Sequence, residues 1–186
     1  MTAHALHIAT YNMHKGLSPL NTRLRLPDIA RSLKTLAADV VFLQEVQGRH
    51  SARAQRFADW PAEAQHQYLA RQLHARATYG LNCAHEHGHH GNAILSRHPI
   101  LTQANEDVSD HRFESRGLLH CEIQVDGVAS PVHCVCVHLG LTAGSLTFTT
   151  LIALVPLVTV GLAVFTAFPM FNGFEAALQK YFLQNL

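Results

Sequence analysis

The sequence predicts an α/β fold for residues 1–141, followed by a hydrophobic segment in residues 142–186. The first observation is the apolar run of residues 40–43, whose length and β-branched composition are typical of a strand buried on both faces. The second is the alternation of strand-like and helix-like segments around it. The third is charge, since beyond residue 141 the only charged residues are Glu175 and Lys180. We therefore expect two different regions, an α/β domain and a membrane-type segment.

The overall charge and the cysteines restrict the class of protein. A formal net charge of +1 gives no basis for a strong preference for nucleic acid, although it leaves room for a local basic patch. The N-terminus has no apolar run of signal-peptide length, and the four cysteines form no Cys-x-x-Cys pair. Both features indicate reduced thiols in a cytoplasmic domain. Cys134 and Cys136 are two residues apart in a strand-like run, so we interpret them as core residues.

Two neighbouring strands are expected at the start of the chain. Residues 6–12 form the first, with Leu6, Ile8, Thr10 and Asn12 on one face. A helix that begins near Pro27 joins it to the second strand, residues 39–45, which ends at Glu45. Because this connection is long enough for a crossover, the strands can be parallel neighbours, with Asn12 and Glu45 at the same edge.

The middle of the chain carries weaker signals. We interpret residues 46–60 as a polar, basic loop, and its arginines as a solvated face rather than a phosphate site. A helix is predicted near Pro61, with Tyr68, Leu69 and Leu73 on its apolar face. The alternating histidines His85, His87 and His89 could bind zinc, but no paired cysteines accompany them, so a polar hairpin before a strand at residues 93–97 is the favoured interpretation.

An antiparallel hairpin is predicted near residue 140. The runs 116–125 and 132–139 flank Asp126-Gly127, a strong signal for a type I′ turn. His138 lies near the end of the second run, on the face of Cys134 and Cys136. By itself it is typical of a hydrogen-bonded structural histidine.

Five short motifs together resemble the endonuclease/exonuclease/phosphatase superfamily in order and spacing over residues 4–141. They are Thr10-Tyr11-Asn12, Leu43-Gln44-Glu45, His90-Gly91-Asn92-Ala93-Ile94-Leu95-Ser96-Arg97, Ser115-Arg116-Gly117 and Val137-His138-Leu139. The resemblance implies a four-layered α/β sandwich of two packed mixed sheets, which hydrolyses phosphoesters, nucleic acids among them, with Mg²⁺ or Mn²⁺. It also implies site roles: Glu45 as the metal-binding carboxylate, Asn12 and His138 as catalytic residues, and Asn92 and Arg116 as phosphate-binding groups.

The sequence departs from this family pattern after residue 141. The family continues to a Gly-Asp-x-Asn motif and a terminal Asp-His pair, which position and activate the attacking water, whereas residues 142–186 contain no Asp and no His. We therefore expect an incomplete sandwich that is inactive as written. We also expect the inner face of the first sheet, with Leu6, Ile8 and the 40–43 run, to lack its second sheet and to remain an exposed apolar patch.

Residues 142–174 carry no charge, which favours a transmembrane helix at 146–168 over a buried core helix. The tail is similar to the YihY/BrkB family of inner-membrane proteins at Leu146-Thr147-Phe148-Thr149-Thr150-Leu151 and Ala167-Phe168-Pro169. The alternative function is therefore an integral inner-membrane protein, with residues 1–141 as a fused cytoplasmic part. The junction near residue 142 resembles a splice of two reading frames, by fusion, rearrangement or assembly error. If the tail is an artefact, the domain is simply cytoplasmic.

Overall fold

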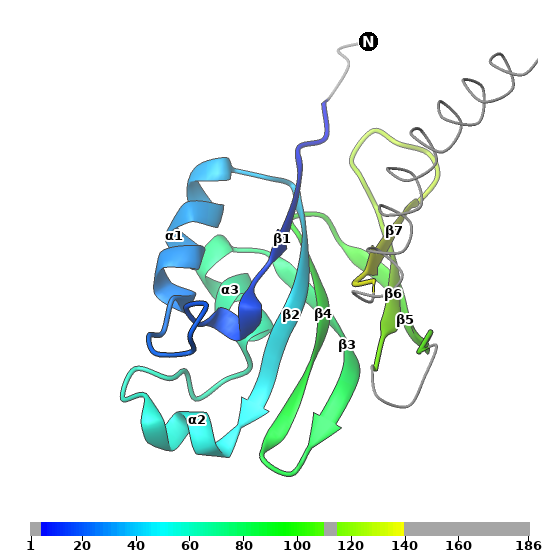
Figure 1. Cartoon of the computed structure of the whole chain (residues 1–186). Helices are drawn as coiled ribbons and strands as arrows, with labels where there is room; N and C mark the ends of the chain where they lie inside the picture. The colour runs from blue at the N-terminus through cyan, green and yellow to red at the C-terminus, as the bar shows by residue number, and fades with distance from the viewer. Residues whose placement is uncertain (1–4, 110–114, 140–186) are drawn as a thin grey trace, which may run out of the picture. The chain divides into compact units, whose positions relative to one another are not determined.

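The computed structural model describes residues 5–109 and 115–139. These residues form two β-sheets and three α-helices (Figure 1). The helical elements are a turn of 3₁₀ helix, η1 (His14–Gly16), and the helices α1 (Leu26–Leu36), α2 (Ser51–Arg56) and α3 (Gln65–Leu73). The strands are β1 (Ile8–Asn12), β2 (Val40–His50), β3 (Arg76–His85), β4 (Gly88–Ser96), β5 (Ile100–Asp107), β6 (Gly117–Ile123) and β7 (Val132–Val137).

The first sheet has the strand order β1-β2-β4-β3. β1 and β2 run parallel, with Ile8 beside Val40 and Asn12 beside Gln44, as the crossover predicted. α1 makes that crossover: Pro27 lies in its first turn, and it ends where Ala37 adopts a left-handed backbone. Asn12, at the polar end of β1, therefore lies beside Gln44 in the middle of β2.

Two apolar layers hold the described residues together. On one face of the first sheet, α1 and α3 pack over a core that includes Leu33, Leu43 and Leu69 (Figure 1). On the other face, Val40 and Ile94 pack against the second sheet, whose strand order is β5-β6-β7. The result is a helix–sheet–sheet arrangement of three layers. A fourth layer, as in the full sandwich, stays a prediction.

The expectation of an uncovered inner face was largely wrong. The strands β6 and β7 supply Leu119, Cys121, Ile123, Cys134 and Cys136 to the core between the sheets, and Val40 is fully buried beneath them. Ile8, on the edge strand β1, is nevertheless 60% exposed. A three-stranded sheet is thus wide enough to cover the centre of the first sheet but leaves its β1 edge exposed.

The predicted loop at residues 46–60 is partly strand and partly helix. β2 continues through Val46, Gln47 and Gly48, all buried, as far as His50, and α2 follows directly. His50 caps α2 by accepting a hydrogen bond from the Arg53 backbone N–H at 3.3 Å. The polar composition of this segment did not predict a strand. Gln47 can nevertheless be buried in one, because its side chain forms hydrogen bonds inside the fold.

The hairpin of β6 and β7 is confirmed, but its turn differs from the prediction. The strands pair from Ile123 beside Val132 onward, so the connection is longer than a two-residue turn. Within it, the Val128 N–H donates to the Val125 carbonyl at 3.1 Å. Of the two central residues only Gly127 has a positive φ, 78°, whereas a type I′ turn needs positive φ at both.

Among the described residues, no helix is long and apolar enough to cross a membrane. The helix predicted at residues 146–168 lies outside the described ranges.

Candidate functional site

Glu45 stands at an irregularity in β2. The pairing of β2 with β4 shifts register between Leu43 and Val46, and Glu45 has a left-handed backbone with φ of 53°. Such a bulge re-aims the side chain of the residue that it displaces. Asn12, the last residue of β1, donates a hydrogen bond from Nδ2 to Glu45 Oε1 at 3.1 Å. The parallel strand pair therefore brings the two predicted residues into direct contact.

His138 reaches the same carboxylate from the second sheet. It follows β7 directly, and its Nε2 lies 3.9 Å from Glu45 Oε1. The end of β7 is held there by Cys136, whose thiol lies 3.6 Å from the Leu43 carbonyl and accepts a hydrogen bond from Gln44 Nε2 at 3.5 Å. Three residues from three separate segments thus converge on one point between the sheets.

Two further residues at this point were missed by the sequence analysis. His14 Nδ1 and Lys15 Nζ lie 3.7 and 3.8 Å from Glu45 Oε2. Both belong to η1 and have left-handed backbones, with φ of 46° and 58°. The signal that could have identified them is their place directly after the polar end of β1, where a loop delivers side chains to a site.

The electrostatic environment keeps Glu45 ionised. Partial burial raises the pKa of this carboxyl, but the hydrogen bond from Asn12, the positive charge of Lys15 and the charges that His138 and His14 carry when protonated outweigh that effect and hold its pKa below the ordinary value. On β4, burial and the charge of Lys15 lower the pKa of His90 to about 4. At neutral pH the site therefore combines a carboxylate with a neutral His90 imidazole.

The other two predicted site residues, Asn92 and Arg116, form hydrogen bonds with groups other than Glu45. Asn92 is fully buried, and its Nδ2 donates to the carbonyls of Gly117 at 2.9 Å and Cys136 at 3.3 Å. Arg116 is partly buried at the entrance to β6, where its backbone N–H donates to Ser109 Oγ at 2.8 Å. The phosphate-binding roles of Asn92 and Arg116 stay predictions.

The donor atoms near Glu45 fit a lightly coordinated ion. Asn12 directs its amide oxygen to the His14 backbone N–H, 2.9 Å away, so Glu45 supplies the carboxylate oxygens at this edge. Within residues 5–109 and 115–139, no group of three or more His, Cys, Asp or Glu side chains could hold a metal ion by itself. Mg²⁺ commonly binds through one or two carboxylates and keeps several water molecules. The residues present therefore suit an Mg²⁺ ion held by Glu45 and water.

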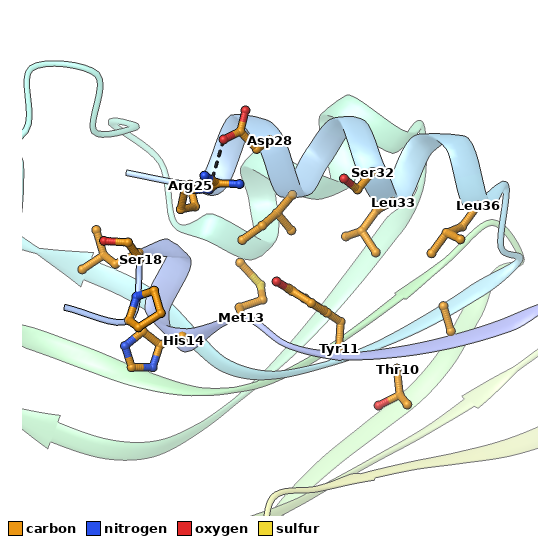
Figure 2. Close-up of a pocket in the computed structure, with 14 residues that line it drawn as sticks. Thr10, Tyr11, Met13, His14, Ser18, Arg25, Asp28, Ser32, Leu33 and Leu36 are labelled. Atoms are coloured by element: carbon orange, nitrogen blue, oxygen red, sulfur yellow. Dashed lines mark ion pairs between the residues drawn. The ribbon is translucent and has the colours of Figure 1, made fainter. Parts of the chain in front are cut away.

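A cavity lies beside this edge, between β1 and α1 (Figure 2). Its volume is about 580 Å³, and it is lined by Tyr11, Met13, Leu33 and Leu36, with an ion pair between Arg25 and Asp28 at 3.1 Å at one end. Glu45 is not among its lining residues. The cavity thus adjoins the site through His14 but does not contain the carboxylate.

Comparison with known proteins gives two kinds of match. An uncharacterized protein of Escherichia coli strain K12, YbhP, is 40% identical over 134 residues, which are 72% of this chain and 53% of YbhP. The chain therefore spans about half the length of this curated relative. At the C-terminus, a UPF0761 membrane protein of Methylibium petroleiphilum is 73% identical over 49 residues, which are 26% of this chain and 12% of that protein.

A solved structure and a family model agree with the fold. The crystal structure of an endonuclease/exonuclease/phosphatase from Beutenbergia cavernae superposes with a TM-score of 0.57 and 26% identity, over 72% of this chain and 38% of that chain. The family model described as the Endonuclease/Exonuclease/phosphatase family matches residues 9–178, further than the motifs recognised in the sequence. Because this match includes the strands that carry Asn12, Glu45 and His138, and extends over most of the sequence, the chain belongs to the endonuclease/exonuclease/phosphatase family.

Proposed function

We propose that the residues around Glu45 are the metal-binding and phosphate-binding part of a metal-dependent phosphoesterase site. The observation that supports this most strongly is the convergence on one carboxylate of Asn12 at 3.1 Å and His138 at 3.9 Å. Asn12 ends β1, Glu45 lies at the bulge in β2 and His138 follows β7, and this placement on regular elements favours a site over a chance surface cluster. Family membership supplies the reaction class, hydrolysis of phosphoester bonds.

Each residue has a role that its chemistry suits. Glu45 would hold Mg²⁺ or Mn²⁺, and the bound ion would neutralise charge on the phosphoryl oxygens. Asn12 fixes the carboxylate through its hydrogen bond. His138 and Lys15 lie on opposite oxygens of Glu45, where they can donate to a phosphate group, and Arg116 is the remaining phosphate-side candidate. The substrate would be a phosphoester, with nucleic acid included in that class.

We further propose that this chain, as written, has no significant phosphodiesterase activity. General acid–base help typically contributes about 10²–10⁴-fold, and residues 142–186 provide no Asp or His for it. The test is hydrolysis of a generic phosphodiester with Mg²⁺ by the purified chain and by Glu45→Ala. We expect background rates from both. Clear Mg²⁺-dependent turnover that disappears in Glu45→Ala would contradict the proposed inactivity and support the proposed site.

A second candidate function is membrane attachment through residues 146–168. The supporting observations are the absence of charge from residues 142–174 and the 73% identity with a UPF0761 membrane protein. In this arrangement residues 1–141 would face the cytoplasm from the inner membrane. Alkaline carbonate extraction of cells that express the chain should leave it in the membrane pellet, whereas release of the whole chain into the supernatant would count against insertion.

A further inference from the structure

We propose that Asn92 is a positioning residue that sets Arg116 and His138 opposite Glu45. This inference rests on the proposed function, because it concerns how the phosphate-side groups reach the carboxylate. Asn92 is fully buried, so in this conformation its side chain reaches the site only through other groups.

The two hydrogen bonds of Asn92 end next to both phosphate-side candidates. Its Nδ2 donates to the carbonyl of Gly117, which follows Arg116, and to the carbonyl of Cys136, two residues before His138. These carbonyls lie at the adjoining ends of β6 and β7, where Leu118 pairs with Val137. One amide group therefore anchors the second sheet at the end that carries both candidates.

Asn92 is also placed opposite the bulge in β2. In the pairing of β2 with β4, Leu43 lies beside Ala93 and Val46 beside Gly91, so Asn92 faces the bulge that contains Glu45. A buried amide whose donors are satisfied has a fixed orientation, since breaking those bonds would leave buried polar groups without partners. Asn92, on β4, thus connects the bulge of β2 to the ends of β6 and β7 that carry Arg116 and His138.

Asn105, an exposed asparagine, provides a control for the loss of a bond between the sheets. Its Nδ2 donates to the Leu81 carbonyl at 3.0 Å, a bond that likewise runs from one sheet to the other, between β5 and β3. Neither Asn105 nor Leu81 is a sequence neighbour of Arg116 or His138. A purely structural role for Asn92 would make Asn92→Ala and Asn105→Ala equivalent at the site.

The experiment measures two properties of the full chain in the wild type, Asn92→Ala and Asn105→Ala. The first is the Kd of inorganic phosphate in the presence of Mg²⁺. The second is the nuclear Overhauser contact between the His138 ring and the Glu45 side chain. For Asn92→Ala we expect a Kd raised about tenfold, as for the loss of one charge-assisted hydrogen bond, and loss of the contact. For Asn105→Ala we expect a Kd within about twofold and an unchanged contact.

The outcomes separate this inference from the proposed function. If the wild type binds no phosphate, the proposed function fails, and the His138–Glu45 contact alone decides the inference. A contact retained in Asn92→Ala, or lost equally in Asn105→Ala, would overturn it. If Asn92→Ala does not fold, Asn92→Ser, which keeps a small polar group at this position, is measured in the same way and with the same expectations.

Discussion

The position of Glu45 and its neighbours depends on a left-handed backbone conformation at three residues. His14, Lys15 and Glu45 all have positive φ, a conformation that costs a non-glycine residue roughly 1–2 kcal/mol. Asn12 and Gln65 hold this arrangement, since Asn12 Oδ1 accepts from the His14 N–H and Gln65 Nε2 donates to the Lys15 carbonyl at 2.8 Å. Backbone strain of this kind is typical of functional sites that the surrounding structure holds in place.

Replacing Lys15 by methionine should raise the pKa of Glu45. The ammonium group lies 3.8 Å from the carboxylate and is one of the charges that hold this pKa below the ordinary value. The measurement is an NMR titration of the Glu45 side chain. Arg49→Met is the control, because Arg49 is exposed and does not contribute to the shift. An unchanged Glu45 pKa in Lys15→Met would show that the ion pair does not form in solution.

Individual side chains also explain which site residues the sequence could predict. Asn12, Glu45 and His138 follow apolar runs, so their places after strand-forming residues could be read from the pattern, although β2 continues past Glu45 to His50. The place of His14 and Lys15 directly after β1 could also be read, but their contact with Glu45 could not, because it depends on left-handed backbone at positions that are neither glycine nor proline. The burial of Asn92 was equally hidden, since it depends on carbonyls of the second sheet.

At the scale of elements, α3 is fixed to the site by one buried glutamine. Gln65 is fully buried; besides its bond to the Lys15 carbonyl, its Oε1 accepts the Gln47 backbone N–H at 3.0 Å. It therefore joins α3, β2 and η1. A helix attached in this way supports the loop that carries His14 and Lys15.

Gln65→Ala should lower the free energy of unfolding by about 2–3 kcal/mol, because it leaves a buried N–H and a buried carbonyl unsatisfied. Gln67→Ala, in the same helix, removes only the bond from the Ala64 N–H to Gln67 Oε1 at 3.2 Å and should cost about 0.5–1 kcal/mol. Urea unfolding measures both values. Equal losses in the two variants would contradict the role assigned to Gln65.

The elements divide clearly into those that the sequence could predict and those that it could not. The β1–α1–β2 unit and the β6–β7 hairpin have the apolar periodicity of their elements, and both are present. β3 and β5 were missed because their polar residues obscure the alternation: all but the first residue of β5 are exposed. In β4, position 91 requires glycine, because a Cβ there would lie 1.8 Å from the Gly80 carbonyl oxygen. Sequence periodicity does not reveal such a packing constraint.

For the whole molecule, three partly buried histidines predict loss of stability in acid. His50, His66 and His90 each have a pKa lowered to about 4, chiefly by burial. Between pH 6.5 and 4 the unfolded chain binds more protons than the folded chain, so the free energy of unfolding falls as the pH falls through this window.

The midpoint of thermal unfolding, measured from pH 7.5 to 4.5, should therefore decrease below pH 6.5. His66→Phe is the informative variant, because it can keep the ring stack with Tyr79, whose centroid lies 4.6 Å away, while it removes one titrating group. We expect the midpoint of thermal unfolding to decrease less in acid in this variant. A pH-independent midpoint in the wild type would contradict the burial of these imidazoles.

The exposed edge of the first sheet predicts self-association. β1 lies at the edge of its sheet in the described part of the chain, with Ile8 60% and Tyr11 45% exposed. An apolar edge strand is a template for pairing with another chain, and a lysine there opposes it. Sedimentation of the wild type should show concentration-dependent association that Ile8→Lys reduces. A wild type that stays monomeric at high concentration would refute this prediction.

Mn²⁺ binding followed by electron paramagnetic resonance, with Mg²⁺ as competitor, tests most directly whether Glu45 holds a divalent metal ion. Glu122 provides the matched control, since His133 Nδ1 lies 3.8 Å from its carboxylate and 28% of its side chain is exposed, against 3.9 Å to His138 and 20% for Glu45. We expect that the wild type and Glu122→Gln bind one Mn²⁺ that Mg²⁺ displaces, and that Glu45→Gln does not. Equal Mn²⁺ binding by Glu45→Gln and the wild type would contradict this expectation.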